Sequence, residues 1–150
     1  VLVYGLDKSG DYSILHHAFV CGPGRTTPIG TFRTPFKAAW HPLQGCWGQY
    51  CTQITGNYLF HSSPYNSPNK NDLSYRLYNQ LGTVCSHGCV RLTVADAKWI
   101  YDNCPLGTTV SIYNASSLPV PKPSAPWLDI SSPNRGWDPT DPDPANPWNK

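Results

Sequence analysis

The sequence predicts a mainly β domain with one or two short helices. Charged residues make up only 13% of the 150 residues, and all nine acidic residues are aspartate. A low charge and an absence of glutamate suit strands and turns better than a helical bundle. Hydrophobic residues make up 39% and aromatic residues 13%, which is enough for one compact core.

Short apolar and aromatic runs separated by turn residues predict the strands. We expect strands at residues 1–6, 12–20, 31–32, 49–55, 57–60 and 108–113. Residues 34–48 contain two prolines and two glycines, so we expect a loop there.

Two segments predict helices. Thr93 is a suitable N-cap residue, and the helix that follows should extend to about residue 103. Within it Val94, Ala97, Ile100 and Tyr101 recur at helical spacing and should face the core. A second, shorter helix is expected at residues 73–81.

The residues most suited to chemistry are Cys89 and His61. Residues 86–91 read Ser-His-Gly-Cys-Val-Arg, and His61 follows the strand expected at 57–60. A thiol attacks only as thiolate, and a nearby imidazole can take its proton and hold the resulting ion pair. Gly88 allows a tight turn, so the amide N–H groups of residues 87–89 are candidate oxyanion donors.

Three segments of the chain together resemble a known family. They are residues 86–91, the Phe-His-Ser-Ser-Pro run at 60–64, and Thr-Pro-Ile-Gly-Thr-Phe at 27–32. In this order they are similar to the motifs of the L,D-transpeptidases, the YkuD-type catalytic domain. The resemblance covers roughly residues 1–115 and implies a β-sandwich of mixed sheets. Residues 116–150 would form a separate tail rich in proline and tryptophan.

The resemblance also implies roles for individual residues. Catalytic roles fall to Cys89 as nucleophile, His61 as general base, His87 and Gly88 as oxyanion donors, and Ser62, whose carbonyl would orient the imidazole. Ser86, Tyr58 and Arg91 would line the substrate site. For Arg91 two alternatives stay open, namely an effect on the shape of the loop and a structural ion pair.

The reaction that the resemblance implies is acyl transfer on peptidoglycan stem peptides. A thioester at Cys89 would form at a diaminopimelate residue, and an amine of a second stem would give a 3→3 cross-link. Water as acceptor would make the protein an L,D-carboxypeptidase, and a protein amine would give attachment to the wall. No cofactor or metal is needed, carbapenems are expected inhibitors, and the location would be extracellular, at the wall or surface of a bacterium.

Two alternatives come from other classes of function. Cys85, His87, Cys89 and His61 offer zinc ligands, although the Cys-x3-Cys spacing is not the usual Cys-x2-Cys knuckle. The abundant tryptophan and tyrosine residues also suit a non-catalytic module that binds cell wall or glycan. Such a module would keep its affinity for wall fragments when Cys89 is replaced.

The remaining cysteines number five if Cys89 is the nucleophile, so at most two disulfides form. They are Cys21, Cys46, Cys51, Cys85 and Cys104. Their pairing stays open, but an extracellular location makes some pairing expected.

Composition also excludes several partners. A net charge of +2 gives no strong field for nucleic acid, and no apolar run approaches the length of a membrane span. Methionine is absent, so we expect a processed or truncated chain whose signal peptide or anchor lies outside it.

Two segments lie outside the motifs. The connection at residues 62–83 is longer than the family's usual spacing, and a loop of this length is often an active-site lid. The tail holds nine of the sixteen prolines from residue 118 onward. We expect it to be fixed to a surface with Trp127, Trp137 and Trp148 as anchors.

Overall fold

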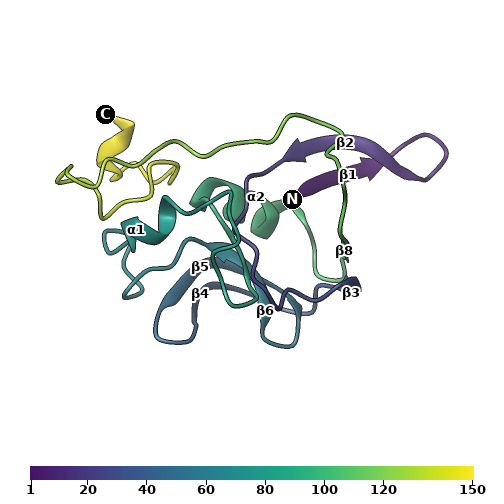
Figure 1. The fold of residues 1–150 in the computed structure, drawn as a ribbon, viewed down its shortest axis with the longest axis horizontal. Helices are drawn as coiled ribbons and strands as arrows, with labels where there is room; N and C mark the ends of the chain where they lie inside the picture. Colours follow the sequence, from purple (N-terminus) through teal and green to yellow (C-terminus); the bar gives the residue numbers. More distant parts are fainter.

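The protein is mainly β, as the sequence predicts, in a computed structural model that describes residues 1–150 (Figure 1). Its largest sheet has the order β4-β5-β6-β7, with bounds Lys37–Pro42, Trp47–Thr55, Tyr58–Ser62 and Val90–Leu92. Neighbouring strands are antiparallel except β6 and β7, which are parallel. This sheet is therefore mixed.

Two smaller sheets complete the strand arrangement. Strands β1 (Leu2–Leu6) and β2 (Tyr12–Ala18) form a hairpin, and β3 (Gly30–Arg33) pairs with β8 (Thr109–Ile112). In Figure 1 the hairpin extends at one end of the molecule, and the chain after β8 runs across the top to the C-terminus at the other end. The strands expected near these positions are confirmed within a few residues.

The expectation of a loop at residues 34–48 is wrong, because β4 occupies Lys37–Pro42. This strand is at the edge of the sheet, and Pro42 is its last residue. An edge strand tolerates proline because one side of its backbone makes no ladder hydrogen bonds. Strand β7 was also missed, since its three residues follow directly on the cysteine motif.

Helix α2 (Val94–Asn103) confirms the predicted cap and inner face. The Thr93 hydroxyl accepts a hydrogen bond from the Asp96 amide at 3.2 Å. Val94, Ala97 and Ile100 are buried, and Tyr101 is half-buried. The helix covers one face of the main sheet, and the core between them is formed by Phe19, Ile54, Phe60, Val90, Leu92, Ala97 and Ile100.

The connection between β6 and β7 is a crossover, not a lid. Parallel strands cannot be joined by a tight turn, so the chain must return to the starting end of β6 before β7 begins. Its residues Tyr65, Leu73 and Tyr78 are buried in a second apolar cluster with Val94 and Leu128. The only helix in it, α1, covers Tyr75–Tyr78, which is shorter than the expected 73–81.

The tail packs against this crossover and the start of α2. Asp138 Oδ2 accepts the Val94 amide at 2.9 Å, and the Thr140 hydroxyl accepts the Ala95 amide at 3.1 Å. The Gly136 carbonyl accepts the Leu73 amide at 2.9 Å. These contacts lie beyond the C-terminal ends of β6 and β7, whereas Cys89 precedes the N-terminal end of β7. The docked tail therefore does not cover Cys89.

Side-chain hydrogen bonds order the proline-rich tail. Four Asx-Pro steps begin at Asp138, Asp141, Asp143 and Asn146. Each of these side chains accepts the amide two residues on, at 2.8 to 3.1 Å, from Thr140, Asp143, Ala145 and Trp148. Proline has no N–H, so the next residue supplies the first amide that the Asx side chain can bind. The last turn leads into a 3-10 helix, η1 (Pro147–Asn149).

The expectation that three tryptophans anchor the tail is wrong for Trp127, which is 78% exposed. Leu128, the next residue, is buried instead. Trp137 and Trp148 are half-buried, and the Trp148 indole N–H donates to the Asn134 carbonyl at 3.0 Å. Buried polar side chains provide the other anchors, since Asp138, Asp141 and Asn146 are all 0% exposed.

The expected disulfides are not present, and all six cysteines are free thiols. Cys46 and Cys51 are close in sequence, but Cys51 lies within β5 and Cys46 precedes that strand. An extended chain advances about 3.3 Å per residue, which carries their Cα atoms beyond the reach of a disulfide.

As for helices, none has the length and apolar character that spanning a membrane would require.

Candidate active site

Cys89 ends the loop that leads into β7. The register pairs Phe60 with Val90 and His61 with Arg91, so Cys89 lies beside the start of β6. Its thiol is half-buried and donates to the Asn57 carbonyl at 3.4 Å. Because side chains alternate along a strand, Val90 faces α2 while Cys89 and Arg91 share the opposite face with His61.

His61 is held in one orientation within β6. Its side chain is buried, with 2% of the residue exposed, and Nδ1 lies 2.5 Å from the Ser62 carbonyl oxygen. A carbonyl only accepts, so Nδ1 must carry the hydrogen and Nε2 of the neutral ring keeps its lone pair. Gly48 packs against the other side, since a Cβ there would lie 3.0 Å from the His61 Cβ. Ser62 thus makes the contact that the sequence predicts for it.

Burial keeps both reacting groups neutral. It raises the pKa of the Cys89 thiol above its usual value, and the opposing effects of a Leu59 backbone hydrogen bond and of Arg91 are smaller. Burial likewise lowers the pKa of His61 to about 4. Both shifts favour a thiol and a neutral imidazole near neutral pH over the ion pair that the sequence suggests.

The nucleophile loop, residues 85–89, is fixed from both sides. On one side the Pro23 carbonyl accepts the amides of Cys85 and Ser86 at 3.1 and 3.3 Å. On the other, the Ser86 hydroxyl donates to the Cys89 carbonyl at 2.5 Å, and the Arg91 guanidinium donates to the Cys85 carbonyl at 2.6 Å. Ser86 and Arg91 were predicted to bind substrate, and in this structure their polar groups shape the loop.

Gly88 lies where no larger residue fits. A Cβ at this position would overlap the Tyr58 ring and come within 2.8 Å of the Thr26 hydroxyl. His87 beside it is exposed, and its carbonyl accepts from Thr26. The amide N–H groups of residues 87–89 have no acceptor within the protein. Tyr58, predicted to line the substrate site, therefore lies directly against the turn that carries these free donors.

No set of three or more His, Cys, Asp or Glu side chains is arranged to hold a metal ion. The zinc alternative required Cys85, His87, Cys89 and His61 to converge. Instead Cys85 packs against Gly22, and His61 is buried within the sheet. The geometry gives that alternative no ligand set.

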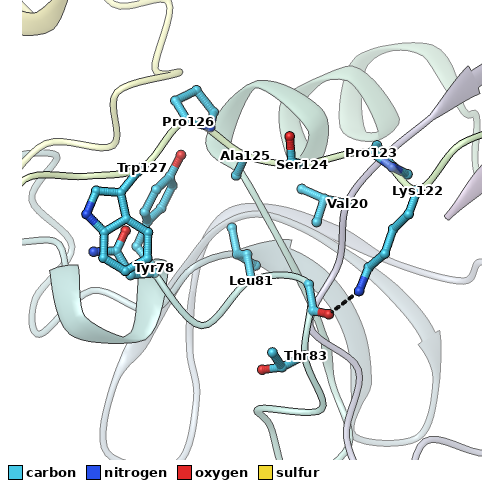
Figure 2. A pocket seen from close by; sticks show the side chains of 12 residues that line it. Val20, Tyr78, Leu81, Thr83, Lys122, Pro123, Ser124, Ala125, Pro126 and Trp127 are labelled. Carbon is cyan, nitrogen blue, oxygen red and sulfur yellow. Dashed lines mark hydrogen bonds between the residues drawn. The ribbon is translucent and has the colours of Figure 1, made fainter.

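A cavity of about 310 Å³ lies away from these residues, under the exposed strap of residues 118–127 (Figure 2). Tyr78, Leu81 and Trp127 are among its lining residues, and none of the predicted site residues lines it. Figure 2 shows Lys122 reaching from the strap toward the chain below, where its ammonium donates to the Gly82 carbonyl at 2.7 Å. The cavity is thus separate from the thiol site.

The sequence and the fold both match one family. The sequence model of the YkuD family, the L,D-transpeptidase catalytic domain, matches residues 5–112. This chain belongs to that family. The protein YciB of Bacillus subtilis (strain 168), which carries the L,D-transpeptidase name, is 39% identical over 93 residues. That match covers 57% of this chain and 46% of YciB, so the chain spans about half the length of this curated relative.

Solved structures share the fold. An L,D-transpeptidase from Mycobacterium smegmatis has a TM-score of 0.55 at 18% identity, covering 67% of this chain and 50% of the other. LdtMt1, solved in complex with imipenem, has a TM-score of 0.54 at 19% identity with the same coverage. A fused Zn-dependent amidase/peptidase/peptidoglycan-binding domain-containing protein from Clostridium acetobutylicum ATCC 824 has a TM-score of 0.50 at 36% identity, covering 67% and 41%. These likenesses confirm the predicted fold class.

Two neighbours of the nucleophile loop have no role in the prediction from the sequence. Thr26 and Thr27 both contact it, and Thr27 opens the Thr-Pro-Ile-Gly-Thr-Phe segment. That segment was used only as a family marker. Its spatial relation to residues 85–89 depends on long-range pairing between the Gly22–Gly24 backbone and the loop.

Proposed function

We propose that this protein is an L,D-transpeptidase that acts on peptidoglycan stem peptides through a cysteine acyl-enzyme. The Cys89 thiol would attack the carbonyl of the diaminopimelate residue in a tetrapeptide stem. The bond to the terminal D-Ala breaks, and a thioester to Sγ forms. An amine of a second stem then attacks the thioester and gives a 3→3 cross-link. Family membership supports this class of reaction.

The observation that carries the proposal is the orientation of His61. With Nδ1–H donated to Ser62, Nε2 is the nitrogen available as a base. It would take the proton from Sγ as the thiol attacks and return it to the departing D-Ala amine. The imidazole would then accept a proton from the incoming amine in the second half of the reaction. A pKa of about 4 keeps His61 unprotonated at the start of each half of the reaction.

Developing charge has donors beside the nucleophile. The carbonyl oxygen of the substrate becomes an oxyanion when sulfur adds to it. The free amides of residues 87–89 are hydrogen-bond donors of the kind that stabilise such an oxyanion. Because the donors belong to a loop fixed by Ser86 and Arg91, little reorganisation is needed when charge develops.

Substrate and location follow from the same proposal. Stem peptides lie outside the cytoplasmic membrane, so we place the working protein outside the cell, at the wall or surface of a bacterium. Carbapenems are proposed inhibitors because the LdtMt1 structure was solved with imipenem. The acyl acceptor is proposed to be an amine, with water as the alternative that would make the enzyme an L,D-carboxypeptidase.

Two mass measurements test the proposal. Intact mass after incubation with imipenem should rise by one adduct in the parent and by none in Cys89→Ala. Purified disaccharide-tetrapeptide should yield a dimer lacking one D-Ala, and a monomer lacking D-Ala would identify the carboxypeptidase instead. A parent that forms no adduct and no product, yet binds wall fragments as well as Cys89→Ala does, would overturn the enzyme in favour of a binding module.

A further inference from the structure

Two neighbouring carbonyls of the nucleophile loop are bound from outside the loop. The His87 carbonyl accepts both the Thr26 amide at 3.1 Å and the Thr26 hydroxyl at 2.6 Å. The Gly88 carbonyl accepts the Thr27 hydroxyl at 2.8 Å. Thr26 and Thr27 therefore fix two consecutive peptide planes at the residue before the nucleophile.

Fixing a carbonyl also fixes an amide. A trans peptide is planar, and its C=O and N–H point in opposite directions. The carbonyl of His87 shares its plane with the N–H of Gly88, and the carbonyl of Gly88 shares its plane with the N–H of Cys89. Since each carbonyl points toward the threonines, each N–H points away from them. These N–H groups have no acceptor in the protein.

Packing also restricts the peptide plane between His87 and Gly88. A Cβ on Gly24 would overlap the peptide between His87 and Gly88, so the Gly24 backbone lies against the face of this plane. Tyr58 lies against Gly88 from another side. The plane is thus confined by contacts on its face and by Thr26 at its carbonyl edge.

We infer that Thr27, together with Thr26, is a positioning residue that aims the Gly88 and Cys89 amides at the oxyanion. The inference rests on the proposed acyl transfer and adds to it the residues that orient the donors. Neither threonine needs to touch substrate. Each acts through a carbonyl of the loop.

Thr27 should matter more than Thr26. The Thr27 hydroxyl is part-buried and uses both of its capacities, since it donates to Gly88 and accepts the Gly24 amide at 2.8 Å. The contact of the Thr26 hydroxyl is exposed, so water can replace it, and the Thr26 amide also holds the same carbonyl. Removing the Thr27 hydroxyl leaves the Gly88 carbonyl without this partner and the Gly24 amide without its acceptor.

The test compares two reactions of the same thiol. Acylation by imipenem passes through a tetrahedral oxyanion, whereas alkylation by iodoacetamide is a displacement at carbon with no oxyanion. Thr27→Val should slow acylation at least tenfold and change the alkylation rate at Cys89 less than twofold. Thr26→Val should show the same pattern with a smaller decrease, and Thr27→Ser should restore the parent rate.

The matched control is Thr31→Val, the same change in β3, where the hydroxyl contacts only Ser111 at 3.4 Å. Equal acylation rates in Thr27→Val and the parent would overturn the inference but not the proposed function. A parallel loss of acylation and alkylation would do the same, because it would indicate a purely structural role for Thr27. If Thr27→Val does not fold, Thr26→Val decides by the same ratio. A parent that imipenem does not acylate overturns the proposed function, and the inference with it.

Discussion

The nucleophile loop and the docked tail are both irregular, yet they use the backbone in opposite ways. In residues 85–89 the carbonyls of Cys85, His87 and Gly88 are bound, and the amides of residues 87–89 stay free. In residues 138–148 four amides are bound by an Asx side chain two residues earlier, and those of Asp141 and Asn146 are bound by backbone carbonyls. One segment leaves donors available and the other satisfies them.

This difference explains the composition of the two segments. The tail contains Asp and Asn before proline because a short side-chain oxygen can reach the amide that follows the proline. The loop contains glycine and lies against threonines because a donor site needs its carbonyls held and its amides uncovered. The same backbone groups therefore serve order in one region and chemistry in the other.

The largest effect should come from removing the base. His61→Ala should reduce imipenem acylation by about 10³-fold or more, close to Cys89→Ala, because base and nucleophile act as a unit. Stopped-flow or mass-resolved acylation rates measure this. Retention of most activity in His61→Ala would transfer the role of base to another residue, with His87 the first to examine.

A methyl group on the loop should separate chemistry from stability. Gly88→Ala has to displace Tyr58 or Thr26, so the donors move and acylation should fall by about 10²-fold. The fold should lose about 1–3 kcal/mol through overpacking. Acylation kinetics and thermal unfolding measured on one preparation check the rate and the stability. Gly45→Ala is the control, because a Cβ at Gly45 meets no atom and the change there tests backbone strain alone.

The pH dependence of the thiol should show that the resting pair is neutral. Burial raises the pKa of Cys89, so its alkylation rate should increase about tenfold per pH unit between about pH 6 and 8. A thiolate–imidazolium pair would instead react at a nearly constant rate across this range. Peptide mapping after iodoacetamide treatment isolates Cys89 from the other five thiols.

The tail should matter for stability far more than for chemistry. Asp138→Ala removes the acceptor of the Val94 amide at the start of α2 and should cost about 2 kcal/mol. The Tm should fall by about 4–8 °C, while the acylation rate of the folded protein stays within a factor of two. Asp129→Ala is the control, because Asp129 is exposed and binds only Ser131. A large loss of acylation in Asp138→Ala would break the contrast between the two regions.

The smallest effect concerns acid stability, where the two regions oppose each other. The pKa of His61 is lowered to about 4, so the unfolded state binds more protons between pH 6.5 and 4, and His61 makes stability fall as pH falls. The pKa of Asp138 is raised by burial to about 6, so the folded state binds more protons there, and stability rises as pH falls. The parent should therefore show a shallow slope between pH 6 and 4.

Replacing the Asp138 carboxyl should reveal the pH dependence of stability that comes from His61. Asp138→Asn leaves His61 alone, so the free energy of unfolding from urea titrations should fall more steeply from pH 6 to pH 4 than in the parent. An unchanged slope would mean that Asp138 titrates no differently in the folded and unfolded states.

The sequence predicted the parts of the site that depend on neighbours along the chain. The cap at Thr93 and the contact of His61 with the Ser62 carbonyl are of this kind. It did not predict that Thr27 binds the Gly88 carbonyl, because this contact joins segments about sixty residues apart. Residues 62–83 looked like a lid because a long polar stretch does not reveal that β6 and β7 are parallel. The boundary at residue 115 between catalytic domain and tail stays a prediction.

The parallel pairing of β6 and β7 has a consequence for how the protein acquires its reactivity. His61 and Cys89 come to the same face of the sheet only after the intervening crossover has closed and β6 has paired with β7. Closing a long loop is a slow, entropically costly step in folding. Local structure such as the β4–β5 hairpin can form well before it. The rate at which Cys89 is alkylated during refolding should therefore change when β6 and β7 pair. The thiol can thus be used to time this long-range step of folding.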